Sequence, residues 1–526
     1  MLTGFGGLLR VALEGERRRT PVTVAAFVAI FLATSAQLAT LAPTLAEREA
    51  LRTTVSASAS FTLLLGPFEH PETVASTTSW RIGLFMAGAL AVLAALTVVR
   101  HTRREEESGR LELVRAARVG RLASLAAAVT SALLMVVVTA GASAVTLLPR
   151  DASGEQALAF AVALAVPALV AIGLAAATSE VATTGRAASG LAVGIVLAGY
   201  VVRGVADVRG WDVLAAAEPF GWSVDVDPFG EVRWIAVVPA LVVTVLLVAA
   251  AALLARDRDL GAGLLAVRAG RPGSTRLTGP VPLALRLERS AFLGWAAVLA
   301  LFGAFVGSVL PSLGEVAGSN PQFQRMLEQL GGEGALVDAF LVTMSQFFSV
   351  AVACWTLSHL GTLVAQEARG PVEAVLATGV SRPRLLLGHV VLGFAGAVVL
   401  ELVVALGVGT QGPAGDALAA FAVHLPAVWL LAAVGALVLG GWPQHWWVAW
   451  AVLILSAVAG VFGDLLGLPG WVQDLSVLSH VPAVPTVDPD WAPLLTTTAA
   501  AVVVTAAAVV LHRRRDVPAA ARARRH

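Results

Sequence analysis

Two charged segments, half a chain apart, share a pattern of residue types that could serve recognition or force transfer. Residues 105–121 (EEESGRLELVRAARVGR) align without a gap over residues 366–382 (QEARGPVEAVLATGVSR), and seven of the 17 columns are identical. The shared pattern, E-x-x-G-x-x-E-x-V-x-A-x-x-V-x-R, predicts a short amphipathic helix whose glutamates lie early, where the helix dipole favours negative charge. The glycine in the pattern would permit another backbone to approach closely.

A charged helix that occurs twice could be a lever for a cytoplasmic partner that is itself paired. The alternative is a solvated surface helix that touches no partner. The duplication favours the lever, because a paired partner needs two matching docking points. The predicted partner contacts are Glu105, Glu106, Gly109, Arg110, Glu112, Arg115, Glu367, Arg369, Gly370, Glu373 and Arg382.

Three polar residues lie inside long apolar stretches and are candidates for a substrate path. An ionisable residue within a membrane span is a functional hypothesis by default. Glu401 could bind a cationic substrate, pair with another helix or stay protonated, and His424 could equally be a packing residue. Gln346 belongs to a polar patch that is typical of hydrogen bonds between helices.

Several kinds of chemistry are excluded by residue type. The sequence contains no lysine, so all 36 of its basic residues are arginine, and neither a G-x-x-x-x-G-K-[ST] phosphate loop nor a Schiff-base lysine can exist. The single cysteine, Cys354, excludes an internal disulfide and a Cys-rich metal site. We therefore predict no catalytic residue, no metal ligand and no cofactor bound by this chain, and we expect no nucleic acid as a partner.

The elements that position these residues are membrane-spanning helices. The 526 residues are 57% hydrophobic and only 13% charged, with a mean hydropathy of +0.81, far from the values of soluble domains. A span needs about 20 apolar residues, and twelve stretches qualify, none with the alternation of a barrel strand. They are 21–41, 80–99, 122–148, 155–178, 187–204, 234–255, 291–313, 338–360, 384–408, 416–439, 445–462 and 491–511.

The distribution of arginine predicts the orientation of these spans. If both termini lie in the cytoplasm, about 28 of the 36 arginines lie in the cytoplasmic segments or at the span ends beside them, and about 8 lie on the outer side. Such an excess is typical of the cytoplasmic side of a membrane protein. The predicted location is therefore the bacterial cytoplasmic (inner) membrane, with many passes, membrane lipids around the helices and both termini inside.

The two charged segments each follow the second of six spans, so the chain reads as a duplicated six-span unit. Because six is even, the two copies have the same orientation and are parallel repeats. The expected all-α organisation is an N-terminal cytoplasmic amphipathic segment (1–20), a first half (21–255) with its charged helix at about 103–121, a cytoplasmic linker with a second amphipathic segment (256–290), a second half (291–511) with its charged helix at about 364–382, and a basic tail (512–526).

The first charged segment resembles the coupling-helix region of ABC-2-type exporter permeases. The resemblance is strongest to the fused twelve-span actinobacterial permeases of polyketide-antibiotic and multidrug efflux. The stretch 256–273 (RDRDLGAGLLAVRAGRPG) is similar to the linker of that family, and EPFGW (218–222) and SHVPAVP (479–485) are similar to its outer loops.

The resemblance implies a type V exporter-like membrane domain made of two six-helix halves. Short re-entrant helices, within about 205–233 and 463–490, would cap the path from outside. Two copies of a separately encoded ATPase subunit would dock on the coupling helices and would carry ATP and Mg²⁺. The transported compound would be a hydrophobic small molecule such as an antibiotic, a drug or a lipid.

The favoured hypothesis is therefore the permease subunit of an ATP-driven exporter that is not itself an enzyme. The first alternative is a proton-driven secondary efflux transporter of twelve spans, in which Glu401 and His424 would be the proton relay. The second is a membrane-embedded enzyme that acts on lipid-linked substrates. That enzyme would need a cluster of acids, histidines or metal ligands at one interface, and the sequence offers no convincing one.

Overall fold

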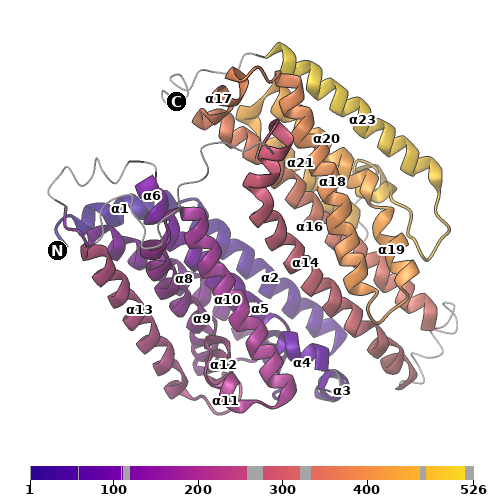
Figure 1. The fold of residues 1–526 in the computed structure, drawn as a ribbon. Helices are drawn as coiled ribbons and strands as arrows, with labels where there is room; N and C mark the ends of the chain where they lie inside the picture. The colour runs from indigo at the N-terminus through magenta and orange to yellow at the C-terminus, as the bar shows by residue number, and fades with distance from the viewer. Residues whose placement is uncertain are drawn as a thin grey trace. The chain divides into compact units, whose positions relative to one another are not determined.

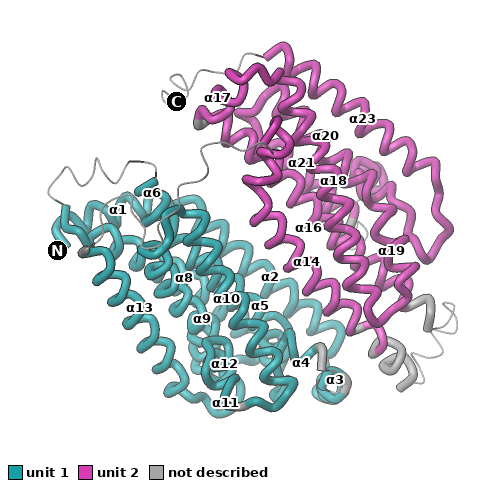
Figure 2. Tube along the Cα trace, viewed as in Figure 1, with its two compact units in different colours: residues 1–270 teal, residues 271–526 magenta. Residues whose placement is uncertain are grey.

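The structure is a computed structural model that describes residues 2–56, 59–107, 109, 119–257, 277–319, 333–462 and 469–515. The described residues form helices joined by turns and loops, without a β-strand (Figure 1). This confirms the predicted all-α fold. The chain divides into two compact units, Met1–Gly270 and Arg271–His526 (Figure 2), and the boundary falls within the segment 256–290 that we expected to be a linker.

The helices of unit 1 follow the order of the predicted spans. They are α1 (Phe5–Glu16), α2 (Arg19–Leu41), α3 (Leu45–Ser56), α4 (Ala59–Leu65), α5 (Val74–His101), α6 (Arg103–Glu107), α8 (Ala123–Val145), η1 (Leu148–Arg150), α9 (Gly154–Val181), α10 (Gly185–Arg209), α11 (Asp212–Ala215), α12 (Pro219–Asp225), η2 (Trp234–Val237) and α13 (Val238–Asp257).

The core of unit 1 is built around α5 and α9, which pack along each other and against α8, α10 and α13. Alanines of α5 such as Ala87, Ala91 and Ala94 are almost fully buried, and small side chains let neighbouring helices approach closely in a membrane. Both helices begin with a capping box, formed by Thr73 and Ser76 before α5 and by Ser153 and Gln156 before α9, so that the first turn of each is satisfied.

Unit 2 has the same order of long helices. Its elements are α14 (Pro280–Ser319), α16 (Glu333–Arg369), α17 (Pro371–Ala377), α18 (Arg382–Val408), α19 (Ala414–Ala422), α20 (Leu425–Gly441), η3 (Pro443–His445), α21 (Trp447–Phe462), α22 (Gly470–Gln473), η4 (Leu478–His480) and α23 (Trp491–Arg514).

Close glycine contacts join two long helices of unit 2. Gly303 and Gly307 form a G-x-x-x-G pair on α14. A Cβ added at Gly303 would lie 2.8 Å from the Val404 carbonyl oxygen of α18, and one added at Gly307 would lie 2.4 Å from that of Val408. The backbones of α14 and α18 can therefore come into contact at these two positions, because glycine has no side chain to keep them apart, as in other pairs of membrane helices.

Eleven helices of the described residues are long and apolar enough to cross a membrane, and they match eleven of the twelve predicted spans. The twelfth, 445–462, falls on α21, which is apolar but has only 16 residues. A helix of that length measures about 24 Å, a little less than a hydrocarbon core of about 30 Å. The following residues 463–468 lie outside the described part, so the count of twelve stays a prediction.

Two predicted boundaries differ from the structure for local reasons. The amphipathic segment that ends at residue 290 was expected to be separate from the span 291–313, but both belong to the single helix α14. Between Leu283 and Leu310 no proline interrupts the run, so nothing ends the helix. The second charged segment was expected to be one helix, but it is broken at Gly370 into the end of α16 and the short helix α17.

Candidate coupling segments and membrane path

The first charged segment turns away from α5 immediately after that helix ends. Thr102 leaves the helical conformation, with φ −116° and ψ −91°, and α6 then carries the acidic run that contains Glu105 and Glu106. Three predicted partner contacts, Arg110, Glu112 and Arg115, lie outside the described residues.

Hydrogen bonds attach this first segment to the turn between α9 and α10. The Arg103 side chain, only 1% exposed, donates from Nη1 to Glu106 Oε2 over 2.9 Å and from Nη2 to the Thr183 carbonyl over 2.8 Å. Glu107 accepts from the backbone N–H of Gly185 at 2.9 Å. The segment is therefore fixed at two neighbouring points rather than hanging freely from α5.

The second charged segment begins at the end of α16. Gly370 ends that helix and Pro371 opens α17, a position where proline is favoured because its missing N–H has no partner in a helix. In α17, Val372 is buried and Glu373 is exposed. The short helix thus packs one face on unit 2 and presents an acidic residue on its surface.

The glycines that align in the two segments share an unusual backbone conformation. Gly109 has φ +73° and Gly370 has φ +99°, in the left-handed region that glycine adopts without the steric cost that other residues incur. A Cβ added at Gly109 would have no atom within 4 Å. Glycine allows this positive φ in both segments. The predicted close approach of a partner backbone at these glycines stays a prediction.

The two aligned glutamates are buried and paired within their own units. The side chain of Glu106 is 6% exposed and accepts from Arg103, and the side chain of Glu367 is 5% exposed and accepts from Arg515 Nη2 over 2.6 Å. These carboxylates hold the segments in place in the isolated chain. Their predicted contact with a partner stays a prediction, and the exposed Glu373 is the better test of it.

A pair of arginines repeats the same contact in both units. Arg121 Nη1 donates to the carbonyl oxygen of Arg256 over 2.6 Å, and Arg382 Nη1 donates to the carbonyl oxygen of Arg515 over 2.5 Å. Arg121 and Arg382 occupy one column of the sequence repeat, and their acceptors lie at the ends of α13 and α23, the sixth span of each half. We call these two contacts the arginine latches.

The latches were not foreseen from the sequence. The repeat marks Arg121 and Arg382 as identical, and only Arg382 was among the predicted partner contacts. The signal in the sequence that could have indicated the latches is the arginine at the end of each sixth span, Arg256 and Arg515. The role of these two arginines could not be inferred, because they accept through backbone oxygens, which every residue has.

A second repeated contact ties each amphipathic segment to the second span of its half. Glu16 at the end of α1 contacts Arg100 Nη1 and, at 2.9 Å, His101 Nε2 of α5. Glu288 of α14 accepts from Thr362 Oγ1 over 2.6 Å and contacts His359, both on α16. Burial raises the pKa of Glu16, but the hydrogen bonds from His101 and Arg100 outweigh it, so the pKa lies below its ordinary value.

The three polar candidates for the substrate path are not joined to one another. Glu401 of α18 is 2% exposed, and neither of its carboxylate oxygens has a hydrogen-bond partner, although the Ser349 hydroxyl of α16 lies nearby. His424, before α20, contacts the Ala420 carbonyl through Nδ1 at 2.8 Å. Gln346 of α16 is half-buried. No hydrogen bond links any two of Glu401, His424 and Gln346, and no group of three or more His, Cys, Asp or Glu among the described residues could hold a metal ion.

The long apolar helices of the described residues define a polytopic membrane protein. The chain belongs to the family of the multidrug efflux system permease Rv1217c, since the sequence model of that family's C-terminal domain matches residues 48–256 and 277–513. It is 33% identical over 505 residues, 94% of this chain and 91% of the relative, to the multidrug efflux system permease protein Rv1217c of Mycobacterium tuberculosis (strain ATCC 25618 / H37Rv). The comparisons confirm the expected membership among multidrug efflux permeases.

Proposed function

We propose that this chain is the transmembrane subunit of an ATP-driven exporter of hydrophobic compounds. A separate ATPase subunit, present in two copies, binds ATP and Mg²⁺ and docks on the segments that follow α5 and α16. The chain lies in the bacterial cytoplasmic membrane with both termini in the cytoplasm, and hydrolyses nothing itself.

The observation that supports this proposal is the repeated attachment of each charged segment to two spans of its own unit. Each segment continues directly from the second span, α5 or α16, and each is latched by Arg121 or Arg382 to the end of the sixth span. A surface helix that served only solubility would not need the same arginine contact twice. A lever needs it, because a displacement must reach more than one helix.

In this mechanism the partner changes the permease by binding one arrangement more tightly than another. ATP draws the two ATPase subunits together, and the docked segments follow. The latches pass that displacement to the sixth spans, and the glutamate contacts at Glu16 and Glu288 pass it to the segments before the first spans. The shift in population can be no larger than the difference in the partner's affinity for the two arrangements.

The test is purification of the tagged chain from its native host, followed by measurement of ATPase activity in the eluate. We expect an ATPase to co-purify with the wild-type chain. In the variant Glu112→Arg/Glu373→Arg, which reverses charge at matching columns of the two segments, we expect at least tenfold less ATPase. Like charges placed together at an interface cost several kcal/mol, and each 1.4 kcal/mol corresponds to a tenfold change in affinity.

The matched control is Glu155→Arg, which reverses an exposed acid in the first turn of α9, at the other end of unit 1. That variant should retain the ATPase at the wild-type level. The proposal is wrong if the purified chain exports substrate from proteoliposomes with a proton gradient and no ATPase, or if both variants lose the ATPase equally.

A further inference from the structure

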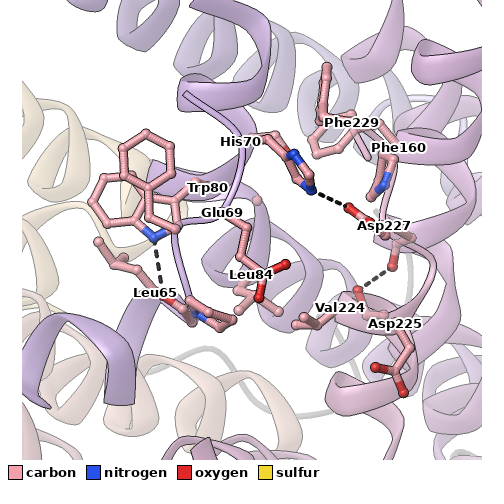
Figure 3. A pocket seen from close by; sticks show the side chains of 18 of the residues that line it. Leu65, Glu69, His70, Trp80, Leu84, Phe160, Val224, Asp225, Asp227 and Phe229 are labelled. Atoms are coloured by element: carbon pink, nitrogen blue, oxygen red, sulfur yellow. Dashed lines mark hydrogen bonds and ion pairs between the residues drawn. The ribbon is translucent and has the colours of Figure 1, made fainter. Parts of the chain in front are cut away.

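A cavity of about 470 Å³ opens in unit 1 at the end where α5 and α9 begin, remote from α6 (Figure 3). Its walls come from the loop 65–70, the first turns of α5 and α9, the ends of α10 and α11, and the stretch from α12 to Arg233. Its volume lies within the range of sites for small organic ligands, about 300–1,000 Å³. We call it the outer cavity.

Aromatic rings form much of the wall of the outer cavity. Trp80 is stacked on Phe68 with ring centroids 4.3 Å apart and planes inclined by 14°. Phe160 and Phe229 lie next to each other with centroids 6.4 Å apart and planes inclined by 51°. Flat apolar faces of this kind suit a ligand that carries aromatic rings.

The aromatic wall is held by hydrogen bonds to the end of α4. Trp80 Nε1 donates to the Gly66 carbonyl over 3.1 Å. Arg203 of α10, whose side chain is fully buried, donates from Nη2 to the Leu63 carbonyl over 2.8 Å, and the Tyr200 hydroxyl donates to that of Leu64. These contacts give hydrogen-bond donors to carbonyl oxygens that the end of a helix leaves without partners. The wall of the cavity is therefore formed without a ligand.

The charge on the lining of the outer cavity is predominantly negative. Four carboxylates line it, and two have partners: Asp227 contacts His70 Nε2 at 3.0 Å, and Asp207 accepts from Arg203. Asp225 is half-buried, with Arg233 as the positive group that acts on it. Glu69 is exposed and has neither a hydrogen bond nor an ion pair within the described part of the chain.

The position of Glu69 makes its charge available to a ligand. In Figure 3 its carboxylate lies between the wall that holds Trp80 and the one that holds Val224 and Asp225. A cation placed there would meet a free carboxylate and the faces of aromatic rings, and both attract positive charge. An anion of the same shape would be repelled.

We propose that the outer cavity binds an amphipathic organic cation with aromatic rings. This inference names a substrate class and rests on the proposed export function, but its test needs no ATPase. Failure to find an ATPase would overturn the proposed function and leave the cavity untouched, whereas failure of the binding test would overturn only the cation site.

The test is equilibrium binding of radiolabelled tetraphenylphosphonium to the purified full-length chain in nanodiscs, with tetraphenylborate as an anion of the same shape. We expect saturable binding of about one tetraphenylphosphonium per chain and no saturable binding of tetraphenylborate. In Glu69→Gln the Kd should rise about tenfold, as the loss of one close, partly solvated charge pair implies.

Glu155→Gln, which removes an exposed acid at the same end of unit 1 but outside the cavity, is the matched control and should leave the Kd unchanged. Trp80→Ala tests the aromatic wall and should also weaken binding, with a thermal melt to verify that the variant is folded. The proposal is overturned if tetraphenylphosphonium does not saturate, if tetraphenylborate binds equally well, or if Glu69→Gln and Glu155→Gln bind alike.

Discussion

At the scale of single residues, the structure gives the stretch EPFGW (218–222) a physical explanation. The Glu218 side chain accepts from the backbone N–H groups of Phe220 and Gly221 and so caps α12. A Cβ at Gly221 would lie 1.8 Å from the Ala215 carbonyl oxygen, and Trp222 Nε1 donates to the Ala216 carbonyl over 2.7 Å. The stretch is thus a compact turn that comes directly before Ser223 and Val224, which line the outer cavity.

Glu218 gives a prediction about pH. Burial raises its pKa from 4.5 to about 7, against the lowering effect of the two backbone N–H donors. Between those two values the folded chain holds a proton that the unfolded chain has released, so this group lowers the free energy of unfolding as pH rises through the window. We expect the melting temperature of Glu218→Gln, relative to wild type, to increase from pH 5 to pH 7.

The measurement is a thermal melt of the purified chain at half-unit steps of pH. The control is Glu155→Gln, whose difference from wild type should not follow the same trend. A difference between Glu218→Gln and wild type that stays constant, or that falls with pH, would contradict a raised pKa for Glu218.

At the scale of elements, the sequence predicts the helices well and their ends less well. Apolar length alone was enough to predict the span that α9 occupies, because the 28 residues of that helix contain only two acids, one near each end. The break at Gly370 was not predicted, because the pattern of charged residues indicates helical periodicity but does not reveal the positive backbone φ angle of this glycine. The arginine latches were missed because their acceptors are backbone oxygens, and the outer cavity because its walls come from loops far apart in the sequence.

The contact between α14 and α18 gives a prediction about packing. In Gly307→Val the new side chain would overlap the Val408 carbonyl oxygen, so the helices must separate. Overpacking of this kind costs about 1–3 kcal/mol, and we expect a melting temperature lower by several degrees. Gly294→Val, on the same helix where an added Cβ has no atom within 4 Å, is the matched control and should melt close to wild type.

At the scale of the whole molecule, the two units share a set of contacts at the segments that the sequence repeat aligns. Each half carries the positive-φ glycine, the buried glutamate that is paired with an arginine, the arginine latch and the glutamate contact from the segment before its first span. The outer cavity lies in unit 1. We infer that the two halves share the means of receiving force, and that the proposed cation site belongs to the first.

The most direct test of this account is to break both latches and compare ATP hydrolysis with export. In Arg121→Gln/Arg382→Gln we expect the ATPase to co-purify and hydrolyse ATP, while ATP-driven export in proteoliposomes falls about tenfold, since a hydrogen bond from a charged group contributes about 1.5–3 kcal/mol. Arg384→Gln, an exposed arginine two residues beyond Arg382, should export normally. Wild-type export by the double variant would contradict the claim that the latches carry force from the coupling segments to the spans.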